Sequence, residues 1–292
     1  MRKFVIFCFY AVFVLTMLTL LLFFTFLFYK GFSNFSLEII FDNVAIIDAI
    51  LGKARVFDGI FNAIVGSILV SSLAVIFALP IGFLSAVFIA IFAPKKIKRV
   101  LSFSYELLAS IPSIVIGLFG LSITIYLHKA FFDDLYTCLL ISSISLAILI
   151  TPYVVKMCED ALNKTPNSIK NCALNLGATR YQNLFFVQLP YIKKELFSSI
   201  VLSIARAVED TSVIMLTGAV AMASIPNSLL AKYEALPFFI FYISSEYQDI
   251  YELNKAYVAA LILLFVSITL FIFAFIIQKL ALKGGANGQF KL

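Results

Sequence analysis

The chain has 292 residues, of which 62% are hydrophobic and 13% charged, and its net charge is +6. Soluble globular domains are nearer half apolar and a quarter charged, so this composition excludes an ordinary soluble domain and predicts an integral membrane protein. A single histidine and four scattered cysteines (Cys8, Cys138, Cys158 and Cys172) offer no spacing typical of a metal site or a disulfide framework.

Six apolar runs are long enough to cross a bilayer, which takes about 20 residues per helix. They predict an all-α membrane protein with six transmembrane helices. The predicted spans cover residues 4–29, 59–93, 107–127, 135–155, 196–222 and 256–278.

Three of the apolar stretches have features of their own. The second run contains Pro80 and is longer than one straight crossing, so we expect it to kink or to lie partly at the membrane interface. The third contains Pro112, Gly117 and Gly120, which suit close packing of neighbouring helices. The apolar segment 235–243 is too short to span and predicts a re-entrant or packed loop.

The polar stretch 159–190, between the fourth and fifth spans, predicts a short amphipathic helix. We expect Thr165 to be its N-cap, Pro166 its first residue and Gly177 its C-cap. Thr179 then begins a second short helix that we expect to end at Pro190. The apolar face of the first helix combines Ile169, Cys172, Ala173 and Leu176. So short a helix lies on the membrane surface or in the groove of a partner.

The fifth span carries Arg206, Glu209 and Asp210 near its middle. Each charge costs about 2.5–3.5 kcal/mol at the bilayer centre, so we expect the charges to be paired. On a continuous helix Arg206 faces Glu209 and Asp210 one turn later, which predicts an ion pair on one helix face. The pair is either a structural link between spans or part of a hydrophilic path.

The distribution of lysine and arginine predicts the orientation. Placing both termini in the cytoplasm puts most of the basic residues, and the stretch 159–190, on the cytoplasmic side. The net positive charge then reflects membrane topology, and we expect no binding of nucleic acid.

The stretch 159–190 resembles the EAA loop of ABC importer permeases. Asn171-Cys172-Ala173, three residues, Gly177 and, further on, Leu189-Pro190 follow that pattern, with Asn171 in place of the family's Glu and Cys172 in place of its first Ala. The resemblance implies the type I (MetI-like) permease fold and a coupling helix that inserts into an ATPase subunit. By position, the coupling residues are Ile169, Asn171, Cys172, Ala173, Leu176, Gly177, Leu189 and Pro190.

A second resemblance concerns the fifth span. Residues 205–211, followed by 216–218, are similar to the Ala-Arg-x-x-Gly-Glu-Thr signature of phosphate importer permeases, with Glu209 in the Gly place and Asp210 in the Glu place. Residues 112–118 and 235–237 are closer to the PstA family of subunits than to the PstC family. The resemblance implies that Arg206 and Asp210 line the phosphate path, and we expect Glu209, which adds a negative charge that the family lacks, to lie beside them in that path.

Together the resemblances imply a domain plan and a set of partners. The plan is a first span and extracytoplasmic loop over 1–58, a permease core over 59–282 and a basic tail over 283–292. The implied partners are a PstC-like second permease, a PstB-like ATPase dimer that uses ATP and magnesium, a PstS-like extracytoplasmic phosphate-binding protein, phosphate itself and the bilayer of a bacterial cytoplasmic membrane.

Other functions are also compatible with the sequence. The chain contains no catalytic set and no Gly-rich phosphate loop, so we expect it to be neither an enzyme nor an ATPase, and to bind no cofactor itself. A permease for another oxyanion, such as molybdate or sulfate, is the main alternative. A secondary transporter is a further one, although it is expected to show inverted repeats of interrupted helices.

Overall fold

The structure is a computed structural model that describes residues 2–42, 44–50, 56, 59–130 and 136–287. Its regular elements are helical, and two of them, η1 and η2, are π-helices. In chain order they are α1 (Arg2–Ser33), α2 (Leu37–Phe41), α3 (Ile46–Ile50), α4 (Phe61–Val87), η1 (Phe88–Phe92), α5 (Lys95–Ser110), α6 (Ser113–Ala130), α7 (Leu139–Asn163), α8 (Asn167–Asn175), α9 (Arg180–Gln182), η2 (Asn183–Gln188), α10 (Leu189–Val208), α11 (Ser212–Thr217), α12 (Leu236–Glu246) and α13 (Ile250–Asn287).

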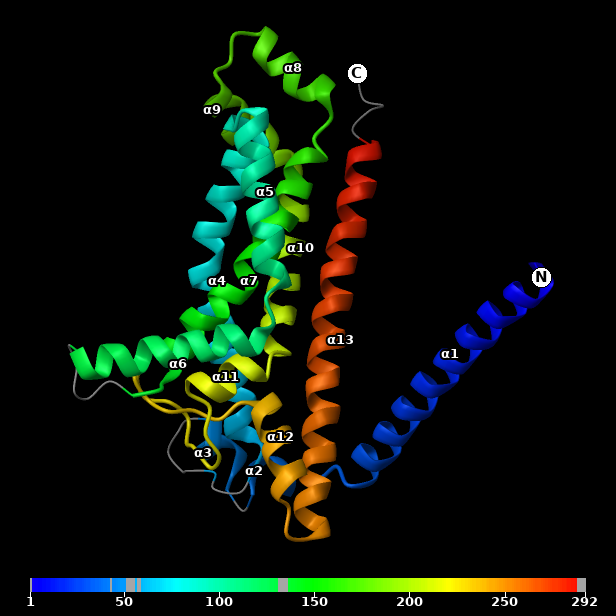
Figure 1. Cartoon of the computed structure of the whole chain (residues 1–292), viewed down its shortest axis with the longest axis vertical. Helices are drawn as coiled ribbons and strands as arrows, with labels where there is room; N and C mark the ends of the chain where they lie inside the picture. Colours follow the sequence, from blue (N-terminus) through cyan, green and yellow to red (C-terminus); the bar gives the residue numbers. More distant parts are fainter. Residues whose placement is uncertain (1, 43, 51–55, 57–58, 131–135, 288–292) are drawn as a thin grey trace.

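The core of the bundle is the packing of α4 against α7, with α10 lying against both and α13 lying along α10 (Figure 1). Small residues allow the close approach of α4 and α7. A Cβ added to Gly82 of α4 would lie 2.6 Å from Cγ1 of Val154 on α7. Helices in membranes associate through such close van der Waals packing, because lipid supplies no hydrophobic driving force between them.

The first helix extends away from this bundle. Figure 1 shows α1 diverging from the other long helices, and its contacts are with α13, near the C-terminal end of α1. Phe28 and Phe32 of α1 both pack edge-on against Phe265 of α13. Nearly all of the remaining surface of α1 is exposed and apolar, as expected of a helix surrounded by lipid.

Five helices of the described chain are long and apolar enough to cross a membrane, namely α1, α4 with η1, α6, α7 and α13. The fifth predicted span corresponds in part to α10, which is 20 residues long but carries Lys193, Lys194, Glu195 and Arg206. The second predicted span runs as one helix from Phe61 through Pro80 to Phe92, where its last five residues widen into π turns. The sixth predicted span lies within α13, which continues to Asn287 and so includes the first part of the tail.

The prediction of a single third span over residues 107–127 is wrong. The chain breaks at Ile111-Pro112, so residues 107–110 form the end of α5 and residues 113–127 lie in α6. Proline disfavours the helical conformation of the preceding residue, and Ile111 is indeed extended (φ −67°, ψ 127°). Helix α5 therefore runs along the bundle and α6 lies across it (Figure 1).

The apolar segment 235–243 forms α12, a helix packed against α13 and α4. Its buried residues are Leu236, Pro237 and Phe239. The segment is packed and too short to span, as predicted, but it is a helix rather than a loop. This helix and the irregular chain before it close the end of the bundle that lies opposite α8 (Figure 1).

Candidate functional site

The fifth predicted span is interrupted beside its charged residues. Helix α10 ends at Val208, Glu209 is its C-cap, and α11 starts at Ser212, so the prediction of one helix to Met222 is wrong. At the break, Oδ1 of Asp210 accepts a hydrogen bond from the backbone N–H of Val213 at 2.8 Å, which ties this carboxylate to the first turn of α11. The side chain is buried, with 5% of the residue exposed.

The predicted ion pair between Arg206 and Asp210 is also wrong. The two residues lie on either side of the helix break, so the one-turn spacing that would bring them together does not exist. The guanidinium of Arg206 lies over the ring of Tyr153 on α7, 5.5 Å from its centroid. Such a cation–π contact stabilises by about 0.5–2 kcal/mol, depending on how dry its surroundings are.

Arg206 keeps its donors available in this arrangement. Within the described chain, the side chain of Arg206 takes part in no hydrogen bond and no ion pair, and its contact is with the ring of Tyr153. Glu209 is exposed at the end of α10, so the additional carboxylate points out of the packed core. The break thus combines a half-buried cation with free N–H groups and a buried carboxylate already bonded to the first turn of α11.

Tyr153, which sequence reasoning missed, also lines a cavity between α5 and α7. The cavity has a volume of about 190 Å³. Its lining residues are Ser102, Tyr105, Glu106, Ala109, Pro152, Tyr153, Val155, Lys156 and Glu159. A tyrosine after a proline in an apolar span gives no local signal of such a role, because the contact with Arg206 depends on how α7 packs against α10.

An ion pair between a half-buried lysine and a buried carboxylate joins one end of this cavity to the 159–190 stretch. Nζ of Lys98 on α5 lies 3.1 Å from Oε1 of Glu159, which is buried near the end of α7. On α8, burial lowers the pKa of Lys170, and the nearby charge of Lys98 lowers it further. The starts of α5 and α8 and the end of α7 therefore form one connected region.

The predicted helix in this stretch is confirmed as α8, although its cap differs from the prediction. The helix starts at Asn167, and Pro166 occupies the N-cap position. Thr165 is buried, and its hydroxyl caps nothing. At the other end Gly177 adopts a positive φ of 87°, and the bonds Gly177 N–H to Leu174 O and Ala178 N–H to Ala173 O close a Schellman motif.

The second short helix begins as predicted but does not end at Pro190. Thr179 and Gln182 form a capping box at the start of α9. The chain then continues without a break through η2 into α10, with Pro190 in the first turn of α10. Proline has no N–H to donate and its ring crowds the preceding turn, and a π-helical turn before Pro190 accommodates both effects.

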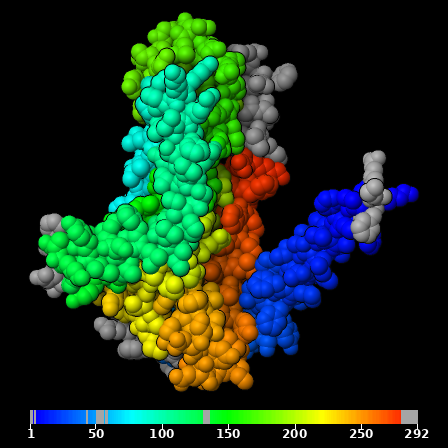
Figure 2. Space-filling view, viewed as in Figure 1, coloured from blue at the N-terminus to red at the C-terminus, as the bar shows by residue number. Residues whose placement is uncertain are grey.

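The predicted coupling residues are divided between two environments. Asn171, Cys172, Leu176, Gly177 and Pro190 are exposed, whereas Ile169, Ala173 and Leu189 are half-buried against the protein. The exposed apolar surface of this region includes Leu174, Leu176, Tyr181, Phe185 and Phe186, and Leu176 is 84% exposed. Figure 2 shows α8 and α9 projecting at one end of the molecule, where this surface is accessible.

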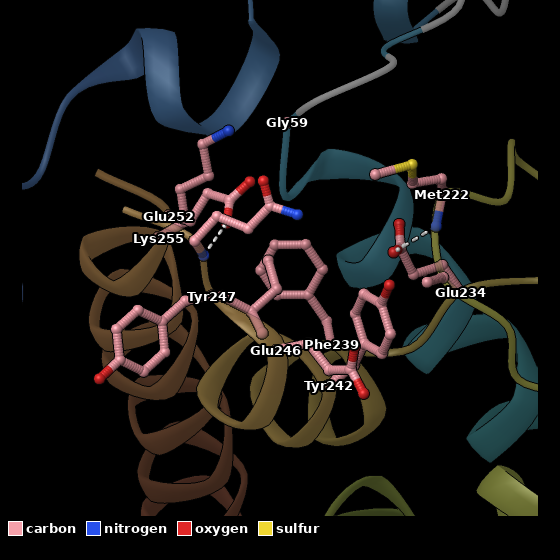
Figure 3. A pocket seen from close by; sticks show the side chains of 12 residues that line it. Gly59, Met222, Glu234, Phe239, Tyr242, Glu246, Tyr247, Glu252 and Lys255 are labelled. Carbon is pink, nitrogen blue, oxygen red and sulfur yellow. Dashed lines mark hydrogen bonds between the residues drawn. The ribbon is translucent and has the colours of Figure 1, made fainter. Parts of the chain in front are cut away.

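A second cavity lies at the opposite end, between α12, the start of α13 and the loop after α11 (Figure 3). Its volume is about 120 Å³, and it is lined by Gly59, Ala221, Met222, Glu234, Phe239, Tyr242, Ile243, Glu246, Tyr247, Gln248, Glu252 and Lys255. The carboxylate of Glu234 accepts a hydrogen bond from the backbone N–H of Met222 at 3.1 Å, and Met222 has a positive φ of 56°. Burial raises the pKa of Glu234 to about 7, and the hydrogen bond from Met222 partly opposes that rise.

The raised pKa of Glu234 predicts a loss of stability with rising pH. The native state holds the proton up to about pH 7, whereas the unfolded chain releases it near 4.5. The free energy of unfolding therefore falls as pH rises from about 4.5 to 7 and stays lower above that range. We expect thermal unfolding of the purified full chain to show this fall, and the Glu234→Gln variant to show a flatter profile. Glu246→Gln, at the exposed rim of the cavity, is the control, and identical profiles for wild type and Glu234→Gln would contradict the assignment.

Comparison with known proteins identifies the family. The family described as binding-protein-dependent transport system inner membrane component matches residues 78–283. The chain belongs to this family. The matched range begins in α4 and includes the 159–190 stretch, the α10–α11 break and most of α13.

Curated relatives share between a quarter and a third of their aligned residues with the chain. The phosphate transport system permease protein PstC of Pasteurella multocida is 32% identical over 173 residues, which are 52% of this chain and 54% of that protein. The probable phosphate transport system permease protein PstA of Methanocaldococcus jannaschii is 27% identical over 214 residues, 73% of this chain and 74% of that protein. The chain spans about half the length of several relatives, including PstA 1 of Mycobacterium tuberculosis.

Solved structures show the fold of this transport component. A bacterial alginate ABC transporter chain superimposes with a TM-score of 0.60 at 16% identity and covers 91% of both chains. A chain of the MetNI methionine ABC transporter gives a TM-score of 0.56 at 15% identity, covering 80% of this chain and 99% of that one. The predicted type I (MetI-like) permease fold is therefore confirmed.

Proposed function

We propose that the chain is one of two permease subunits of an ATP-driven phosphate importer. The names of its relatives support phosphate as the substrate. The observation that carries the proposal is the α10–α11 break, where the half-buried Arg206 contacts an aromatic ring and leaves its N–H groups free. A planar guanidinium binds phosphate oxygens through paired, charge-assisted hydrogen bonds.

The energy source in this proposal is an ATPase dimer on the cytoplasmic side. Helix α8 and the exposed aromatic residues after it form an apolar surface at one end of the bundle, which suits insertion into a groove of the ATPase. Movement of α8 reaches the bundle through two connections. The continuous chain α9–η2–α10 leads to Arg206, and the Lys98–Glu159 pair joins α5 to α7 beside α8.

The remaining partners follow from the family. A second permease subunit completes the path, and a phosphate-binding protein outside the cell delivers the ion to the end of the bundle that carries α12. Both termini lie in the cytoplasm in this arrangement, because most basic residues are then inside. Consistent with it, α8 and the C-terminal end of α13 lie at the same end of the molecule (Figure 1).

Disulfide crosslinking tests the coupling role of α8 in the assembled complex. In a chain whose exposed Cys172 is replaced by serine, we expect Leu174→Cys and Leu176→Cys to crosslink to cysteines placed in the ATPase subunit. Both positions are exposed on one short segment, whereas Ser244→Cys, exposed on α12 at the opposite end, is the matched control and should not react. Failure to crosslink at every position from 168 to 176 would contradict docking by α8.

Transport assays distinguish phosphate from the alternative substrates. In cells that carry the complete transporter, uptake of radiolabelled phosphate should be reduced by excess unlabelled phosphate and not by molybdate or sulfate. Strong competition by either of the other oxyanions would favour a different substrate. Phosphate flux through the permease without an ATPase subunit would instead indicate a secondary transporter.

A further inference from the structure

Tyr153 contacts the candidate substrate residue and also lines a cavity between α5 and α7. Its ring lies under the guanidinium of Arg206, with 5.5 Å between the guanidinium carbon and the ring centroid. The same residue lines the cavity of about 190 Å³ between α5 and α7. Tyr153 is half-buried and follows Pro152 in α7, a helix packed against both α4 and α10.

The chemistry of this contact differs from that of an ion pair. A carboxylate next to Arg206 would occupy its N–H donors and would repel an incoming oxyanion. An aromatic ring attracts the cation through its π face and offers no negative charge to the path. The in-plane N–H donors of the guanidinium then remain available for an anion.

Three other polar residues of the cavity have partners of their own. Glu159 pairs with Lys98 at 3.1 Å, and the hydroxyl of Tyr105 bonds to that of Ser85 at 2.9 Å. Lys156, one turn after Tyr153, lies 4.0 Å from Asp160, and both side chains are more than half exposed. Among the described residues that line the cavity, Tyr153 is the one whose ring contacts Arg206.

We infer that Tyr153 is a positioning residue for oxyanion binding, which holds the guanidinium of Arg206 by its ring face and leaves the N–H edge free for phosphate. The inference depends on the proposed function. Without the ring, Arg206 samples other rotamers, and binding must then order a long side chain that the native structure already holds in place.

Two substitutions at Tyr153 separate the ring from its hydroxyl. In the complete transporter, Tyr153→Phe keeps the π face and should transport phosphate with a KM within twofold of wild type. Tyr153→Leu keeps an apolar side chain but removes the ring, and its KM for phosphate uptake should rise roughly 2- to 30-fold, the range that a cation–π contact implies. The maximal rate per assembled complex should change by less than twofold.

Tyr105→Leu is the matched control, because Tyr105 lines the same cavity and bonds to Ser85 rather than contacting Arg206. A similar rise in KM in Tyr105→Leu, or an unchanged KM in Tyr153→Leu, would overturn the positioning role. The Arg206→Ala variant shows whether a negative result concerns Tyr153 alone or the proposed function as well. If Arg206→Ala abolishes uptake while Tyr153→Leu has no effect, only the role of Tyr153 is wrong, whereas normal uptake in Arg206→Ala removes the basis of both.

Discussion

Replacing Arg206 with alanine is expected to reduce phosphate uptake by about 10- to 100-fold. Hydrogen bonds to charged groups contribute about 1.5–3 kcal/mol each, and a 1.4 kcal/mol loss is a tenfold effect. Arg206 is the half-buried cation at the α10–α11 break, and its donors are free of partners among the described residues. The initial rate of radiolabelled phosphate uptake, in cells that lack any other copy of the subunit, measures the effect.

Two further variants make the result specific for the guanidinium. Arg206→Lys keeps the charge but lacks the planar fork that binds two oxygens, so it should also be impaired. Glu209→Gln changes an exposed charge three residues away and should transport within twofold of wild type. Co-purification with the second permease must be unchanged in all three variants. Normal uptake by Arg206→Ala would refute a role for this residue in the path.

Gly66→Ala is expected to lower the free energy of unfolding by about 3 kcal/mol or more. A Cβ at this position of α4 would lie 1.9 Å from the backbone oxygen of Glu234 and 3.1 Å from its carbonyl carbon. Because these are backbone atoms, no side-chain rotation relieves the overlap. The segment before α12 must then move off α4, which also breaks the bond from the N–H of Leu236 to the hydroxyl of Ser67.

Thermal unfolding of the purified full chain measures the loss, together with its yield in folded form. Ile68→Ala is the control, because Ile68 lies two residues further along α4 and is 52% exposed. It should change the free energy of unfolding by no more than about 0.5 kcal/mol. Wild-type stability of Gly66→Ala would show that the segment around Glu234 does not pack on α4 as described.

Features that depend on residues close together in the sequence could be predicted from the sequence alone. Hydropathy located the apolar helices, because a bilayer imposes the same length on each of them. The presence of a helix before Gly177, its glycine terminus and the cap at Thr179 were predicted correctly, since such features depend on a few consecutive residues, whereas the predicted cap at Thr165 is wrong. The break at Pro112 also had a local signal, which the apolar character of residues 107–127 concealed.

The candidate substrate site was predicted in part. The sequence singled out Arg206, Glu209 and Asp210, because charges in an apolar run are costly. It did not reveal their arrangement. The local sequence allows Asp210 either to pair with Arg206 one turn earlier or to accept a hydrogen bond from the first turn of a new helix. The structure has the second arrangement, in which α11 packs against α6.

The sequence by itself determined that this chain is a multi-helix membrane protein with a polar, helical connection between two spans, since composition and short-range patterns carry that information. Only the tertiary structure decided which groups meet: Arg206 with Tyr153, Lys98 with Glu159, and Gly66 with the backbone of Glu234. Each of these contacts joins residues far apart in the chain. Their meeting is set by the packing of whole helices, which no local pattern of residues encodes.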